Sequence, residues 1–264
     1  MSTLEFDHVT VRFGRGRAAH TAVDDASLTV RSGTTLGLVG ESGSGKSTMA
    51  RVAVGLEHAG LGAVRLDGVD LTSRSRAARL ARRRVQLVFQ DPLAALDPRM
   101  PVGTSVAEGL LATGRRFSRA EKEARVRELL GLVHIDPGRA GERPARFSGG
   151  QRQRITIARA LAAEPAVLIA DEITSALDVS VQGVVLNLLR ELRSALDLTM
   201  LFISHNLAVV RYVSDDVAVM RAGRVVEQGP ADTVLAAPSD PYTRELLHAV
   251  PVMGQPLDLA GKDH

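Results

Sequence analysis

The sequence of 264 residues contains no cysteine and no tryptophan, and aromatic residues make up only 3% of it. The absence of cysteine excludes a disulfide framework and a thiolate metal site, and it suits a reducing compartment. No apolar run approaches the roughly 18–20 residues that a membrane-spanning helix needs. The N-terminus, Met1–His8, lacks the basic start and the apolar centre of a signal peptide. If the protein serves a membrane process, we expect another chain to supply the membrane part.

A strong excess of positive charge is also missing. Lys and Arg number 33 against 30 Asp and Glu, which gives a net charge of +3. A general nucleic-acid binder would carry a larger, clustered excess. The densest basic run, 74–84, has apolar residues at helical spacing and no interleaved aromatics. We interpret it as the solvated face of a helix, with contact to a phosphate backbone as the alternative.

A glycine-rich stretch, 40–48, stands out among the features that are present. It reads Gly-Glu-Ser-Gly-Ser-Gly-Lys-Ser-Thr and fits the phosphate-binding pattern G-x-x-x-x-G-K-[ST]. An apolar strand precedes it (34–39) and a helix follows it (49–56), which favours a functional loop over an ordinary turn. Backbone N–H groups and Lys46 would hold phosphates, and the Ser47 hydroxyl would hold a magnesium ion. The candidate nucleotide-binding residues are Gly40, Glu41, Ser42, Gly43, Ser44, Gly45, Lys46, Ser47 and Thr48.

Two acids end a short apolar strand at 167–170. Asp171 and Glu172 would lie at the carboxyl rim of a parallel sheet, where open α/β sheets bind ligands. Asp171 can coordinate magnesium, directly or through water, and Glu172 can orient or deprotonate a water near the γ-phosphate. The alternative is a buried strand that happens to end in two surface acids. The phosphate loop in the same chain favours the functional interpretation.

A second anion-binding helix end is predicted at 147–151, Phe-Ser-Gly-Gly-Gln. Ser148 and Gln151 form a capping box, which starts a helix. Gly149 and Gly150 are poor helix formers within its first turn, and they allow backbone N–H groups to approach something negative. One nucleotide bound at 40–48 does not need this second helix end.

The pattern along the chain predicts strands alternating with helices, as in an α/β fold. The alternation in 3–13 predicts an edge strand, and mostly helical sequence runs from 91 to about 133. Further strands are expected at 23–30, 60–67, 85–89, 199–203, 216–221 and 224–228. Further helices are expected at 148–163, 179–196 and 206–213, with two short helices after them.

Together these stretches resemble the ATP-binding subunit of ABC transporters over about the whole length of the chain. The matching features are the loop 40–48, Gln90 after its strand, 147–151 like the LSGGQ signature, 167–172 like the Walker B strand, 175–178 like the D-loop and His205 like the switch histidine. Details further resemble the oligopeptide/dipeptide and nickel importer group. These are 89–92 with 95–99, 147–154, and the tail 240–247 with Val250 and Pro251.

The resemblance implies a P-loop NTPase (RecA-like) core with an antiparallel β edge subdomain and an inserted helical subdomain. The core would cover about 1–90 and 155–235, the helical subdomain about 91–154, and a C-terminal helical tail about 236–264. It also implies ATP and Mg²⁺ as cofactors. The implied roles are magnesium for Ser47, Gln90 and Asp171, general base for Glu172, γ-phosphate contact for His205, the D-loop for Asp178, adenine stacking for Phe13, and contact with the ATP of a partner subunit for Ser148, Gly149, Gly150 and Gln151.

Two departures from the family pattern affect these expectations. Ile173 stands where the family usually has Pro, so a backbone N–H is freed and the φ restraint on the residue after Glu172 is loosened. The chain is also short at its C-terminus and lacks the cysteines that some relatives place there, so we expect no iron–sulfur cluster.

The expected function is ATP hydrolysis that drives import of a peptide-like solute. The expected partners are a second ABC ATPase subunit, two integral membrane permease subunits and, indirectly, an extracytoplasmic solute-binding protein, with the chain peripheral on the cytoplasmic face of the membrane. A nickel or other small-solute importer is the alternative. A soluble ABC-type ATPase acting on nucleic acid is less favoured, and a nucleotide switch without hydrolysis is disfavoured by Glu172 and His205.

Overall fold

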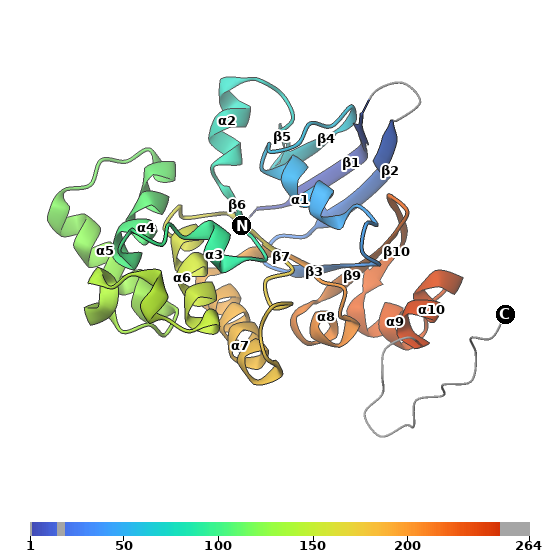
Figure 1. The fold of residues 1–264 in the computed structure, drawn as a ribbon. Coiled ribbons are helices and arrows are strands. Elements are labelled where there is room, and N and C mark those ends of the chain that lie inside the picture. The colour runs from blue at the N-terminus through green and yellow to red at the C-terminus, as the bar shows by residue number, and fades with distance from the viewer. Residues whose placement is uncertain (1, 15–18, 249–264) are drawn as a thin grey trace.

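The computed structural model describes residues 2–14 and 19–248, and the larger of its two sheets forms the centre of the molecule (Figure 1). The strand order is β10-β9-β3-β8-β7-β6, and all neighbours are parallel except β9 and β10. The six strands are β3 (Thr35–Val39), β6 (Val85–Val88), β7 (Val167–Asp171), β8 (Thr199–Ile203), β9 (Asp216–Arg221) and β10 (Arg224–Pro230). The strand before the glycine loop and the strand before the two acids are therefore separated only by β8.

A second, antiparallel sheet holds the N-terminal part of the chain. Its order is β2-β1-β4-β5, formed by β1 (Leu4–Phe13), β2 (His20–Val30), β4 (Leu61–Leu66) and β5 (Val69–Asp70). The prediction that 3–13 is an edge strand is wrong, because β1 pairs with both β2 and β4. Alternation of apolar and polar residues reports that one face is buried, and it carries no information on how many neighbours a strand has.

Helices cover both faces of the large sheet and extend one end of the molecule. The elements around the sheets are α1 (Lys46–Ala53), α2 (Arg76–Arg82), α7 (Val179–Leu196), α8 (Leu207–Val213), α9 (Ala231–Ala236) and α10 (Pro241–His248). The others are α3 (Pro92–Ala95), α4 (Val102–Gly109), η2 (Leu110–Thr113), α5 (Arg119–Leu132), η3 (Pro137–Gly141), η4 (Pro144–Arg146) and α6 (Gly149–Leu161). Figure 1 shows α3 to α6 gathered on the side away from the antiparallel sheet. Among the described residues, no helix is both long and apolar enough to cross a bilayer.

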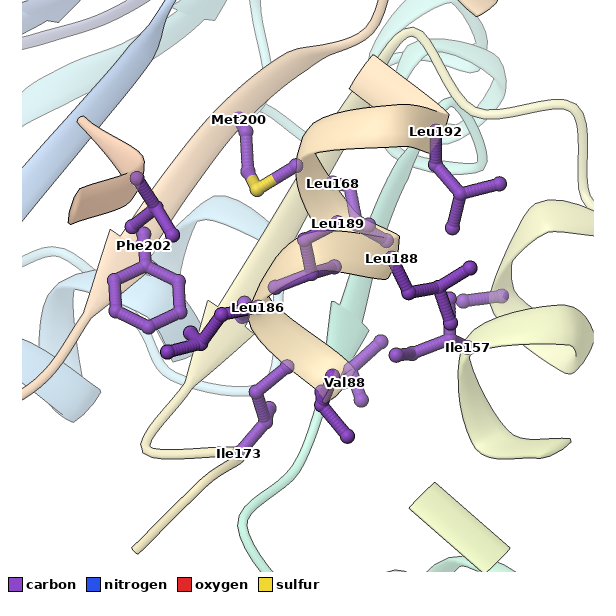
Figure 2. Packing of buried hydrophobic residues seen from close by; sticks show 14 of the residues in the cluster. Val88, Ile157, Leu168, Ile173, Leu186, Leu188, Leu189, Leu192, Met200 and Phe202 are labelled. Carbon is purple, nitrogen blue, oxygen red and sulfur yellow. The ribbon is translucent and has the colours of Figure 1, made fainter. Parts of the chain in front are cut away.

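The two faces of the large sheet bury different clusters. In β7, Leu168 and Ala170 belong to a core shared with α4, α5, α6 and α7, whereas Val167 and Ile169 face a core shared with α1 and the antiparallel sheet. Leu186 and Leu189 of α7 belong to the same cluster as Leu168 (Figure 2). Successive side chains of a strand point to opposite faces, so a strand covered on both sides is apolar throughout. The expected α/β fold with an antiparallel sheet and helical segments is confirmed.

Candidate nucleotide-binding site

The glycine loop between β3 and α1 has a backbone that side chains would obstruct. Gly43 and Gly45 have φ of 80° and 104°, in the region that favours glycine. A Cβ on Gly45 would lie 2.4 Å from the carbonyl oxygen of Ala22, and one on Gly40 would lie 2.1 Å from that of Met220. The loop is therefore enclosed by β2 on one side and the end of β9 on the other.

Lys46 begins α1 and turns its ammonium back into the loop. Its Nζ donates to the carbonyl oxygens of Gly40 (2.8 Å) and Glu41 (2.7 Å), and only 4% of the residue is exposed. Burial lowers the pKa of the Lys46 ammonium, although three nearby carboxylates act in the opposite direction. The loop thus encloses a cation at the position where phosphate would be bound.

Ser47 and Asp171 meet although they are far apart in sequence. The Ser47 hydroxyl donates to Asp171 Oδ1 at 3.0 Å. Burial raises the pKa of the Asp171 carboxyl, although this hydrogen bond from Ser47 favours the charged form. Among the described residues, no group of three or more His, Cys, Asp or Glu side chains gathers around a possible metal. A hydroxyl and one carboxylate suit Mg²⁺, which binds few protein oxygens and takes others from phosphates and water.

Glu172 is held in a backbone conformation that is uncommon for a residue with a side chain. Its φ is 49°, and its N–H donates to the carbonyl of Ile203 in β8 at 3.0 Å. His205 Nδ1 lies 3.4 Å from Glu172 Oε1, and the imidazole is 58% exposed. Both side chains therefore lie at the carboxyl ends of neighbouring strands, beside the Ser47–Asp171 pair.

Ser175 connects Gln90 to this group, and the sequence did not suggest that link. Gln90 Nε2 donates to Ser175 Oγ at 2.9 Å, and Ser175 Oγ donates to the carbonyl of Glu172 at 2.8 Å. Because the Gln90 amide nitrogen is used in this way, its Oε1 is the atom that would serve a metal. The available signal was a Ser three residues after Glu172, a spacing at which a hydroxyl can reach a backbone carbonyl.

Ile173 is buried directly after Glu172. It is 1% exposed and belongs to the core cluster that also contains Val88 and Leu186 (Figure 2). An apolar side chain thus anchors the segment at the position where the family usually has a proline ring.

The predicted second anion-binding helix end lies in the helical part of the molecule. Ser148 and Gln151 form both hydrogen bonds of a capping box, as expected. A Cβ on Gly150 would lie 2.3 Å from Val181 Cγ1 of α7, so close packing is a second reason for glycine there. A Cβ on Gly149 would make only an ordinary contact, 3.6 Å from Leu177. In Figure 1, α6 lies apart from α1, so the structure does not bring this helix end to the loop 40–48.

Two further predicted site residues have surroundings that do not define a role. Phe13, at the end of β1, is 39% exposed and borders a pocket of about 420 Å³ whose lining includes Arg12 and His58 but no residue of the loop 40–48. Asp178 is exposed at the N-cap position of α7 and makes no side-chain capping bond. Adenine stacking by Phe13 and a D-loop role for Asp178 stay predictions.

Sequence reasoning also missed a contact from the C-terminal part of the chain. The N–H of Glu41 donates to the hydroxyl of Tyr242 in α10 at 3.2 Å. The residues that the resemblance quotes beyond His248, Val250 and Pro251, lie outside the described residues.

Two family profiles match this sequence. The profile described as "ABC transporter" matches residues 23–175, which contain the glycine loop, the helix α6 with its capping box, and the acids Asp171 and Glu172. The chain belongs to the ABC transporter family. A second profile, "Oligopeptide/dipeptide transporter, C-terminal region", matches residues 226–263 of this ABC chain.

Curated ABC relatives are similar over most of this chain. A putative peptide import ATP-binding protein of Brucella abortus is 53% identical over 238 residues, covering 89% of this chain and 71% of that protein. OppF of Bacillus subtilis, an oligopeptide transport ATP-binding protein, is 46% identical over 94% of this chain and 82% of its own length. OppD of Mycobacterium tuberculosis is 51% identical over 87% of this chain but only 37% of its own length.

Solved ABC structures share the fold. A dimeric ATP-binding cassette in a post-hydrolysis state with ADP and Pi has a TM-score of 0.77 and 27% identity, covering 86% of this chain and 98% of that one. CbiO1 of Clostridium perfringens, part of an ABC transporter complex, has a TM-score of 0.79 and 28% identity over 89% and 90% of the two chains. The chain is therefore an ABC ATPase, which binds and hydrolyses ATP.

Proposed function

We propose that this chain is the ATP-hydrolysing subunit that powers import of a peptide-class solute through separate permease subunits. One observation carries the chemistry: the Ser47–Asp171 hydrogen bond, with Glu172 and His205 beside it, lies at the glycine loop. The solute class rests on the match of 226–263 to the oligopeptide/dipeptide transporter region and on the names of the relatives.

Each of these residues has a separate role in phosphoryl transfer, a reaction that depends mainly on positioning and on charge stabilisation. The N–H groups of the loop and Lys46 bind the phosphates, while Ser47, Asp171 and Gln90 would hold magnesium. The ion, when bound, would neutralise charge that develops on the phosphate oxygens. Glu172 takes a proton from the attacking water, and His205 contacts the γ-phosphate. Ser175 and the Glu172–Ile203 backbone bond hold Glu172 in place.

A second ATPase subunit, identical or related, would complete the site. Ser148 and Gly149 are exposed, and the helix end that they form lies apart from the loop 40–48 of the same chain. In a head-to-tail pair this end would cap the nucleotide held by the partner. The dimeric state of the solved cassettes supports such a pair.

The helical subdomain, about 91–154, would receive the permease. A groove of about 610 Å³ lies between β6, α3, α4 and α6, and Arg159 and Glu108 in it form an ion pair at 3.2 Å. Phe89, one residue before Gln90, is 41% exposed in its lining. Movement of Gln90 would be transmitted to a permease segment bound in this groove. Movement of Glu172 would be transmitted to it through Ser175 and Gln90. The chain would then lie on the cytoplasmic face of the membrane.

The nucleic-acid alternative loses support from the contacts of the basic run 74–84. Arg82 donates to the carbonyls of Leu71 and Ser73, and Arg84 bonds Ser2 and Asp67. These guanidinium groups stabilise the fold, so the basic run offers fewer charges to a phosphate backbone than its sequence suggests. A nickel or other small-solute importer remains the second candidate, since the resemblance covers that group too.

Purification of the tagged chain from membranes under mild detergent tests the proposal. Two permease subunits and an ATPase partner should co-purify, and ATP hydrolysis should rise when a peptide-loaded binding protein is added. Stimulation by a nickel-loaded protein instead would support the second candidate. Recovery of the chain with nucleic acid and without any membrane protein would refute the transport function.

A further inference from the structure

The C-terminal helix α10 contacts the glycine loop through one buried side chain, Tyr242. The residue is 3% exposed, and its hydroxyl accepts a hydrogen bond from the N–H of Glu41 at 3.2 Å. The Arg221 guanidinium, at the end of β9, lies 4.6 Å from the centre of the tyrosine ring. Burial raises the pKa of the Tyr242 hydroxyl, so the group stays neutral near pH 7.

The ring is placed by contacts that do not involve the loop. The Glu227 carboxylate of β10 accepts hydrogen bonds from Ser239 N and Ser239 Oγ, both at 2.7 Å, and from Asp240 N at 3.2 Å. Asp240 Oδ1 then accepts from Tyr242 N at 2.8 Å. This chain of bonds fixes the start of α10 on the sheet, so the hydroxyl is presented to the loop from a rigid support.

The peptide groups on either side of Glu41 join Tyr242 to Lys46. The Glu41 N–H is bound by Tyr242, and the Glu41 carbonyl accepts from Lys46 Nζ at 2.7 Å. On the other side, Gly40 abuts the Met220 carbonyl so closely that a Cβ would lie 2.1 Å from it. The first turn of the loop is therefore held between β9 and α10, and rotation of the peptide would move the partners of Lys46.

We infer that Tyr242 is a positioning residue for nucleotide binding: its hydroxyl holds the start of the phosphate loop in the conformation that accepts the phosphates. This inference rests on the proposed function, since it assumes that ATP binds at 40–48. It gives the C-terminal region a direct role at the nucleotide, in addition to any role it has toward other subunits.

The Tyr242→Phe variant tests this, because it keeps the ring, its burial and the Arg221 contact, and removes only the hydroxyl. Losing one hydrogen bond that pre-organises a site should raise the Kd for Mg²⁺–AMPPNP about 3- to 10-fold. In the complex purified with its partners, KM for ATP should rise by a similar factor, while kcat at saturating ATP stays within twofold.

Tyr212→Phe is a matched control, since Tyr212 is the other tyrosine of the chain and bonds Asn187, away from the loop. It should leave the Kd unchanged. Equal Kd values for the wild type and Tyr242→Phe would refute the inference, and so would an equal loss in the Tyr212 variant or a fall in kcat without a change in KM. Failure of the wild type to bind Mg²⁺–AMPPNP would refute the proposed function itself and the inference with it.

Discussion

Glu172 shows how a single residue is fixed against its own backbone preference. A positive φ costs a residue with a Cβ on the order of 1 kcal/mol or more, so the surroundings must enforce it. The bond to Ile203, the Ser175 hydroxyl on the Glu172 carbonyl, and the buried side chain of Ile173 all do so. The backbone that carries the Glu172 carboxylate is therefore held by three separate contacts.

Replacing Glu172 by Gln should leave nucleotide binding intact and remove most turnover. The amide keeps the size and position of the side chain but cannot take a proton from water, and a general base contributes about 10²- to 10⁴-fold. Rates of ATP hydrolysis and the Kd for Mg²⁺–AMPPNP measure the two effects separately. Turnover within a few-fold of the wild type would show that Glu172 is not the base.

Truncating Ile173 to Ala should destabilise the protein and also slow hydrolysis. Removal of a fully buried aliphatic side chain typically costs 2–5 kcal/mol in the free energy of unfolding. Urea denaturation measures that cost. The control is Leu111→Ala, which should cost little because Leu111 is 71% exposed. If Ile173→Ala lost stability but kept full turnover, Ile173 would not be positioning Glu172.

At the scale of elements, local signals in the sequence predicted local structure well. The capping box at Ser148 forms as expected, and the helix expected at 179–196 spans those residues. Contacts between distant segments could not be read in this way. The interior place of β1, the role of Ser175 and the contact of Tyr242 with Glu41 all depend on how elements pack, and one sequence alone does not encode that as a local pattern.

The anchoring of α10 should depend on pH. Burial alone would raise the pKa of Glu227, but the nearby Thr243 side chain and the hydrogen bonds from Ser239 and Asp240 outweigh it, so the pKa is lowered. A lowered pKa in the folded state means that the stabilisation is present at neutral pH and is lost as the pH falls through that lowered value, below the usual carboxyl range near 4. Amide exchange in 239–248 should therefore be faster in Glu227→Gln than in the wild type at pH 7. The difference should vanish in acid; a difference that persists there would contradict the assignment to the carboxylate.

For the whole molecule, the proposed head-to-tail pair predicts that one chain holds half of each site, because the loop 40–48 lies apart from the exposed end of α6. Ser148→Arg places a bulky cation at the surface that would face the partner. Pairing in the presence of ATP, measured by sedimentation with Glu172→Gln as the background, should be lost, while the Kd of the single chain for Mg²⁺–AMPPNP should not change. Arg119→Ser alters charge on an exposed helix start elsewhere and should leave pairing intact. Unaltered pairing of the Ser148 variant would argue against a shared site.

During synthesis on the ribosome, β3 is made long before the strands that flank it. Its two neighbours in the sheet are β8 and β9, which end at Ile203 and Arg221. At roughly 5–20 residues per second, the wait is on the order of ten seconds or more. A chain released before β9 carries the complete phosphate-loop sequence but lacks the Met220 carbonyl that shapes it and leaves the apolar β3 unpaired on one side. The ability to bind nucleotide should therefore appear only near the end of translation, and incomplete chains should be substrates for chaperones and proteases instead of partly active ATPases.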